Sequence, residues 1–181
     1  MPNLLLKDLP RYECLLEAAK EFPDLEPSAC ETFLHLLRGG DESVRVMESN
    51  LARHNITQGR FSVLMILLNR CRSNSGTLGP AELADAAGVS RATMTGLIDT
   101  LERDGLVTRA PDTVDRRMML VRLTDKGRAL LEEILPEHFK RMSWLMSPLS
   151  EFERQTLVQL LNKLHQQASK FPAESPSAAA V

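Results

Sequence analysis

The chain has 181 residues, of which 43% are hydrophobic, 25% charged and only 4% aromatic. This length and composition fit one domain with a real core, and the scarcity of aromatic side chains favours helices over strands. The longest wholly apolar run, Val63–Leu68, is too short to cross a bilayer, and the first ten residues lack the pattern of a secretory signal. We therefore expect a cytoplasmic protein with no membrane partner.

The net charge of −2 is unevenly distributed along the chain. Residues 1–50 hold five basic against ten acidic side chains, whereas the remainder holds seventeen against fourteen. A nucleic-acid-binding surface requires basic side chains gathered on one face, not a basic total. The distribution therefore permits DNA binding by the later part of the chain.

Cysteine and histidine patterns exclude several classes of site. Cys14, Cys30 and Cys71 are spaced neither for a metal nor for a disulfide, and their odd number fits a reducing compartment. The four histidines are scattered without a metal-ligand spacing, so no metal or cofactor is predicted. No Ser-His-Asp grouping, phosphate-binding glycine loop or pair of catalytic carboxylates stands out. The sequence predicts a protein that is not an enzyme.

Prolines and glycines divide the predicted N-terminal helices. An apolar stripe predicts a helix over 6–20, after which two prolines interrupt the pattern. Further helices are predicted over 28–38 and 42–54, separated by Gly39-Gly40. A single long helix bent at these glycines is the alternative.

The next segment predicts a buried helix followed by a short strand. Thr57 is suited to cap a helix that begins after it and is apolar nearly all round. Such a helix has no polar face to turn to solvent, so it is expected inside the core. Thr77-Leu78 is predicted as a short third strand beside a later hairpin.

A helix-turn-helix pattern begins at Pro80, which suits the first turn of a helix. The small Ala84 allows a steep helix crossing, and Gly88 allows the turn between the two helices. Ser90 is suited to cap the second helix, which runs to about Arg103. At 1.5 Å per residue this helix is about 21 Å long, which suits a DNA major groove.

A hairpin and two helices are predicted to follow. Gly105 closes the second helix in a left-handed conformation, and segments 106–110 and 118–123 have strand composition around a turn at 111–115. Thr124 is expected to cap a long helix that Pro136 kinks or divides. A last helix starts near Ser150.

In combination these segments resemble the MarR family of bacterial regulators, over roughly residues 30–168. The motifs that carry the resemblance are Ile56-Thr57-Gln58, Leu83-Ala84 with Gly88-Val89-Ser90, Leu101-Glu102-Arg103-Asp104-Gly105-Leu106-Val107, Arg109-Ala110-Pro111-Asp112-Thr113-Val114-Asp115-Arg116-Arg117 and Leu123-Thr124-Asp125-Lys126-Gly127. The resemblance implies a homodimer that binds double-stranded DNA at pseudo-palindromic operators, most often as a repressor, and is released by a small-molecule effector or an oxidant.

The fold class predicted is mainly α, a winged helix-turn-helix with a small β-hairpin wing flanked by N- and C-terminal dimerisation helices. We expect N-terminal dimerisation helices over 1–55 and a DNA-binding lobe over 56–123. C-terminal dimerisation helices are expected over 124–170. Proline, serine and alanine dominate the remainder, which predicts a disordered tail over 171–181.

Short polar side chains near the start of the second helix, above an apolar underside, predict base and phosphate contacts; an ordinary solvated helix face is the alternative. The predicted contacts on this recognition helix are Ser90, Arg91, Ala92, Thr93 and Thr95.

Adjacent arginines at the predicted hairpin tip favour phosphate or minor-groove contact over a plain soluble loop. The family resemblance implies that Arg117 enters the minor groove, and we expect Asp115 to orient it. The predicted wing residues are Arg109, Asp115, Arg116 and Arg117.

Three other interpretations of the function stay open. The first is a low-specificity architectural DNA-binding protein without an effector. The second makes the winged lobe a protein-interaction module. The third is a redox-sensing regulator that uses Cys14. The oxidant-sensing branch of the family activates its thiol with tyrosines, whereas Tyr12 is the single tyrosine of this chain. We therefore expect the cysteines to be buried and inert. Separately, we expect the methionines to fill the core instead of lining a ligand pocket.

Overall fold

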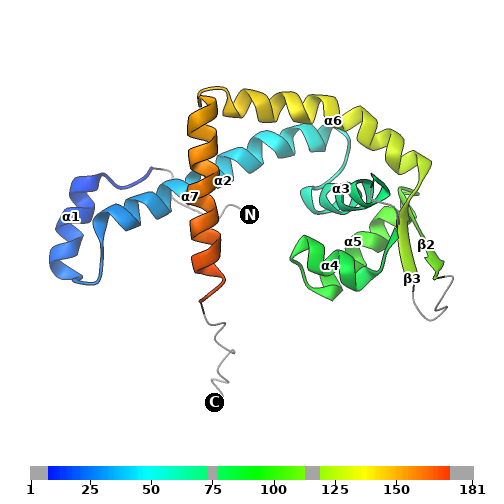
Figure 1. Ribbon diagram of the computed structural model, residues 1–181, viewed down its shortest axis with the longest axis horizontal. Coiled ribbons are helices and arrows are strands. Elements are labelled where there is room, and N and C mark those ends of the chain that lie inside the picture. The colour runs from blue at the N-terminus through cyan, green and yellow to red at the C-terminus, as the bar shows by residue number, and fades with distance from the viewer. Residues whose placement is uncertain (1–7, 73–76, 113–118, 172–181) are drawn as a thin grey trace, which may run out of the picture. The chain divides into compact units, whose positions relative to one another are not determined.

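The computed structural model describes residues 8–72, 77–112 and 119–171 (Figure 1). Its residues group into two compact units, with the boundary between Arg141 and Met142. The mainly helical winged-helix fold predicted from the sequence is confirmed. No helix within the described ranges is both long enough and apolar enough to span a membrane.

The helices and strands follow the predicted order. Their bounds are α1 Tyr12–Glu21, α2 Pro27–Arg53, α3 Gln58–Arg72, β1 Thr77–Leu78, α4 Pro80–Ala87, α5 Arg91–Arg103, β2 Val107–Pro111, β3 Met119–Leu123, α6 Asp125–Met146 and α7 Glu151–Ala168.

Helix α2 is one continuous helix, so the predicted break at Gly39-Gly40 is wrong and the alternative of a single helix is confirmed. Neither glycine has the positive φ that ends a helix. A helical glycine costs only about 1 kcal/mol relative to alanine, which is too little to divide the helix.

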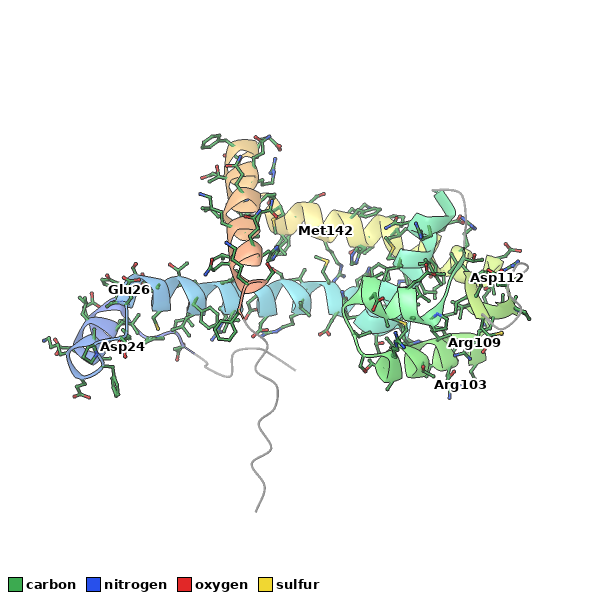
Figure 2. The ribbon with its side chains drawn as sticks, turned by 60° about the horizontal axis from the view of Figure 1, so that its bottom comes forward. Asp24, Glu26, Arg103, Arg109, Asp112 and Met142 are labelled. Carbon is green, nitrogen blue, oxygen red and sulfur yellow. The ribbon has the colours of Figure 1, made fainter. Side chains whose placement is uncertain are left out.

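The carboxylate of Glu26 caps the start of α2 by accepting hydrogen bonds from the amides of Ser28 and Ala29. This turn between α1 and α2 is marked by Asp24 and Glu26 in Figure 2.

Helix α3 is the buried helix that its apolar sequence predicts. It contacts α4, α5, β1 and β3. Figure 1 shows α4, α5 and β3 close to it. Its cap is Thr57, whose hydroxyl accepts a hydrogen bond from the amide of Arg60. The side chains of the core are Leu51, Ile56, Phe61, Val63, Leu64, Leu67, Leu68, Leu78, Leu83, Ala84, Met94, Ile98, Leu101, Leu106, Val107, Val121, Leu131 and Ile134.

The sheet is antiparallel, with strand order β1-β3-β2. Thr77 pairs with Arg122 in β3, which confirms the predicted third strand. Across the hairpin, Arg109 pairs with Val121 and Pro111 with Met119. Strand β2 therefore forms one edge of the sheet, beside α5.

The start of α6 lies very close to the end of α5. The hydroxyl of Thr124 donates to the carbonyl of Gly105 at 2.8 Å and accepts from the amide of Gly127 at 3.0 Å. A Cβ atom at Gly127 would lie 2.2 Å from the carbonyl oxygen of Leu106. The Thr-x-x-Gly spacing therefore provides a helix cap and then a position where the helix touches the backbone of the lobe.

Helix α6 continues through Pro136, so the predicted division at this proline does not occur. An internal proline costs about 3 kcal/mol. Contacts on both sides of it offset this cost, because Ile134 is fully buried and the Arg141 guanidinium donates to the Val46 carbonyl and the Ser49 hydroxyl. Tertiary contacts to α2 thus outweigh the local preference.

Helix α7 begins at the predicted cap, because the Ser150 hydroxyl accepts from the amide of Glu153 and the Glu153 carboxylate accepts from the amide of Ser150. None of its residues is buried. Most of the predicted tail, residues 172–181, lies outside the described residues.

The cysteines differ from their prediction. Cys14 is exposed and Cys30 is partly exposed, so the expected burial is wrong for both. Leu15 is the one buried side chain of α1, so the neighbouring Cys14 stays on the exposed side of that helix. The side chain of Cys71 lies outside the described residues.

We expect Gly127→Ala to lower the free energy of unfolding by about 3 kcal/mol or more, because the added methyl overlaps a backbone carbonyl that cannot move alone. The matched control is Gly40→Ala in α2, where an added Cβ meets nothing within 4 Å. That control should raise stability by about 0.5–1 kcal/mol. Urea unfolding followed by circular dichroism measures both free energies of unfolding. Equal stability of the two variants would contradict the close contact between Gly127 and the backbone of Leu106.

Candidate nucleic-acid interface

The turn between α4 and α5 has the backbone geometry expected for a helix-turn-helix. Gly88 adopts φ 64° and ends α4 in the left-handed region, where a side chain is disfavoured. The amide of Val89 donates to the carbonyl of Ala84 at 3.1 Å, which closes the turn. Ala84 itself is buried at the crossing of the two helices. The predicted roles of these residues are confirmed.

Helix α5 is fixed from its first turn. The Ser90 hydroxyl accepts from the amide of Thr93 at 3.1 Å and lies 2.8 Å from the Thr93 hydroxyl. Beneath this cap Met94, Ile98 and Leu101 are fully buried in the core. The helix is thereby anchored along its underside, and its opposite face is presented outward.

The residues predicted to contact DNA on α5 all lie on this outward face. Ser90, Arg91, Ala92, Thr93 and Thr95 are each exposed. The hydroxyl of Thr95 donates to the carbonyl of Arg91, which holds it against the helix. Among the described residues, the Arg91 guanidinium has no ion-pair partner, so it is available to a phosphate or a guanine edge.

The predicted wing residues fall into two groups. Asp115, Arg116 and Arg117 lie outside the described residues, so their contacts remain predictions. Arg109 is described and is labelled in Figure 2. Its guanidinium forms ion pairs within the chain. It donates to Asp99 at 2.5 Å and to Glu102 at 2.7 Å. A phosphate contact by Arg109 would have to share or replace these bonds.

The electrostatic environment of Arg109 favours its charged form. Burial lowers its pKa, but the hydrogen bond to Asp99 and the negative charges of Glu102 and Asp99 outweigh burial, so the pKa is raised. The predicted role of Arg109 in the wing does not include this cluster. The signal was present, since Asp99 and Glu102 are one helical turn apart.

The C-terminal end of α5 is held by residues that sequence reasoning also missed. The Arg60 guanidinium pairs with the carboxylate of Asp104, and the Lys126 ammonium donates to the carbonyl of Asp104 at 2.8 Å. Gly105 follows with φ 71°. The end of the helix is therefore attached to both α3 and α6. Pairing between residues 44 apart has no local sequence signal.

A pocket of about 410 Å³ lies beside this attachment. Its apolar wall includes Ile56 and Leu130, and its polar groups include Arg60, Lys126 and Glu133. Among the described residues, the buried Nε atom of Arg60 has no hydrogen-bond partner, which is costly for a buried donor. The Arg60 side chain that carries it lines this pocket.

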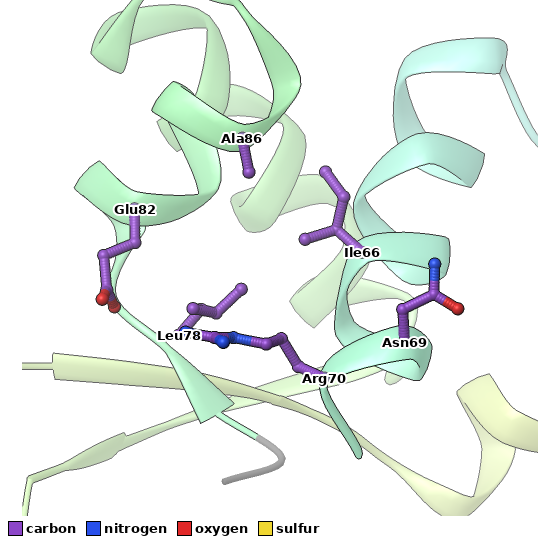
Figure 3. A pocket seen from close by; sticks show the side chains of 6 residues that line it. All are labelled: Ile66, Asn69, Arg70, Leu78, Glu82 and Ala86. Atoms are coloured by element: carbon purple, nitrogen blue, oxygen red, sulfur yellow. The ribbon is translucent and has the colours of Figure 1, made fainter. Parts of the chain in front are cut away.

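A second pocket, of about 360 Å³, lies between α3, β1 and α4. Figure 3 shows Glu82 and Ala86 of α4 across from Ile66 of α3, with Arg70 beside Leu78. The Glu82 carboxylate already accepts a hydrogen bond from the amide of Gly79 at 2.8 Å. This pocket is therefore less suited to orient a ligand. Among the described residues, no methionine lines either of these two pockets, but Met142 and Met146 line a third pocket of about 390 Å³. Both are exposed, so the expectation that methionines fill the core is wrong for these two, whereas it is confirmed for Met94.

Metal binding finds no support in the described ranges. They contain no group of three histidine, cysteine or acidic side chains placed to hold an ion. The candidate interface that the geometry favours is the outward face of α5, because its polar residues are exposed above a buried underside.

Comparisons with known proteins agree with this geometry. The family model described as MarR family matches residues 56–119. The HTH-type transcriptional repressor YetL of Bacillus subtilis is 36% identical over 92% of this chain and 98% of its own. A solved structure of a mutant MarR from Escherichia coli complexed with operator DNA is 28% identical, with a TM-score of 0.62 over 74% of this chain and 91% of its own. A structure of BpsR from Bordetella bronchiseptica, whose DNA binding is regulated by 6-hydroxynicotinic acid, is 30% identical, with a TM-score of 0.63 over 72% of this chain and 91% of its own.

We expect Ser90→Asp to separate stability from DNA binding. Aspartate caps a helix as well as serine does, so the free energy of unfolding should stay within about 0.5 kcal/mol, whereas Ser90→Ala should lose about 1 kcal/mol. The new negative charge on the outward face should weaken binding to a random-sequence duplex at low salt by roughly ten-fold. Ser150→Asp changes the equivalent cap of α7 and is the control. A Ser90→Asp protein that binds DNA like this control contradicts the assignment of the face.

Proposed function

The chain belongs to the MarR family of transcriptional regulators, and we propose that it is a sequence-specific repressor acting as a homodimer on pseudo-palindromic operators. The observation that carries the proposal is the outward face of α5, where Ser90, Arg91 and Thr95 are exposed above a fully buried underside. A helix of this kind places its first turns against base edges in the major groove. The relatives are transcription regulators, not enzymes, which agrees with the absence of catalytic motifs from the sequence.

Homodimerisation is supported by apolar side chains outside the core. Several large apolar side chains on the helices beyond the winged lobe are exposed, and contiguous apolar surface that stays exposed marks an interaction site. They are Leu16, Phe33, Leu36, Val44, Phe152, Leu157, Val158, Leu160 and Leu164. A dimer would place two recognition helices about 34–36 Å apart, one turn of B-DNA.

Release by a small-molecule effector is supported by the pocket beside Arg60. Arg60 lines this pocket and also pairs with Asp104 at the end of α5. A ligand that accepts a hydrogen bond from Arg60 competes with Asp104 and alters how the recognition helix is held. Such a ligand lowers operator affinity if it binds the altered state more tightly.

Selection of bound duplexes from a randomised pool tests the sequence-specific function. We expect one enriched pseudo-palindrome, bound at least about 10³-fold more tightly than random DNA. Arg91→Ala and Arg117→Ala should each weaken binding to it by about ten-fold, because each loses a charged contact. Lys20→Ala, on α1, is the control. Equal affinity for the enriched and random duplexes would instead support the architectural DNA-binding protein.

We expect Asp104→Asn to weaken binding to the enriched duplex by roughly five-fold. Asparagine keeps the polar helix end but loses the charge that holds Arg60. Removal of a negative charge by itself favours DNA binding, so the predicted loss has the opposite sign to a purely electrostatic effect. Fluorescence anisotropy measures the change, and tighter binding by the variant would rule out coupling through Arg60.

A further inference from the structure

We propose that Arg109 is a positioning residue of the DNA-binding face: it neutralises two carboxylates on α5 and fastens strand β2 to that helix. Its guanidinium bonds to Asp99 and Glu102 carry this inference. The expected effect on DNA affinity rests on the proposed DNA-binding function. The cluster of Arg109, Asp99 and Glu102, which we call the clamp, is present in the chain without DNA.

The recognition helix carries acidic side chains on the face that would approach DNA. Asp99 follows Thr95 by four residues and Arg91 by eight, so the three share one face of α5. The Asp99 side chain is 56% exposed and the Glu102 side chain 37% exposed. Carboxylates at this position repel phosphates unless a cation lies beside them.

Arg109 supplies that cation from a different element. One of its terminal nitrogens donates to Asp99 and the other to Glu102, and its side chain is only 24% exposed. The planar guanidinium suits such a fork between two carboxylates better than the lysine ammonium does. The cluster therefore presents one net negative charge where two would otherwise face the DNA.

The same cluster fixes the edge of the sheet. Strand β2 lies at an edge of the sheet formed by the described strands, where outward amides are left without a strand partner. The amide of Arg109 donates to the second oxygen of Glu102 at 3.1 Å. Glu102 thus accepts from both the backbone and the side chain of Arg109, so the position of β2 depends on α5.

The positioning role and a direct phosphate contact predict different responses to charge removal. If Arg109 neutralises Asp99 and Glu102, the pair Asp99→Asn with Glu102→Gln should increase affinity for the enriched duplex much more in Arg109→Ala than in the wild-type background. If Arg109 contacts phosphate, that gain should be equal in both backgrounds. A phosphate contact also lowers the salt slope by about 0.9 when it is lost.

The experiment measures affinity and salt slope for four proteins: wild type, Arg109→Ala, Asp99→Asn with Glu102→Gln, and the triple variant. We expect Arg109→Ala to bind about ten-fold more weakly and the triple variant to recover most of that loss. Arg122→Ala is the matched control, because Arg122 is an exposed arginine of the neighbouring strand. The loss of affinity caused by Arg122→Ala should add to the change in affinity caused by the two carboxylate substitutions. Equal gains in the Arg109→Ala and wild-type backgrounds overturn the proposal.

A DNA-free arm separates the clamp from the proposed function. Thermal unfolding of the same four proteins should show that removing the carboxylates lowers Tm in the wild type and changes it little in Arg109→Ala. Additive changes in Tm overturn the clamp, whereas failure of the wild type to enrich any duplex overturns the proposed function alone. If Arg109→Ala does not fold, Arg109→Gln replaces it, because glutamine keeps a donor without the charge.

Discussion

Burial of one side of α5 against the core is the interaction on which the winged lobe depends. Met94, Ile98 and Leu101 are fully buried beneath this helix, and each such side chain contributes about 1.5–3 kcal/mol relative to exposure. The same burial turns the opposite side, where Ser90, Arg91 and Thr95 are exposed, away from the core. Burial of one side of α5 therefore both stabilises the lobe and exposes the other side. Polar residues can line the exposed side because the buried side packs the helix against the core.

Polar attachments hold the helix where apolar packing ends. Arg60 and Lys126 hold Asp104 at its C-terminal end, while Arg109 holds its acidic side to the sheet. These groups are charged and partly exposed, so each contributes modestly to stability. Their directional hydrogen bonds fix orientation, which apolar contacts leave loosely defined. A change at either attachment is therefore expected to affect DNA binding more than folding.

The segment around Thr124 and Gly127 has a purely steric explanation. Thr124 bridges the end of α5 to the first turn of α6, and any side chain at Gly127 meets the backbone of Leu106. The helix that leaves the winged lobe is thus joined to it by close backbone contact. The first turn of α6 and the end of α5 are therefore held together at this joint.

Local chemistry in the sequence determined the order of elements, the caps at Thr57, Ser90 and Ser150, and the turn at Gly88, because each depends on residues within one helical turn. It also determined which side of α5 faces outward. The tertiary structure alone decided that α2 runs through its glycines, that α6 runs through Pro136, and that Cys14 is exposed. It alone paired Arg60 with Asp104 and committed Arg109 to two carboxylates. These outcomes depend on contacts between residues distant in the chain, where packing outweighs the local preference of about 1–3 kcal/mol.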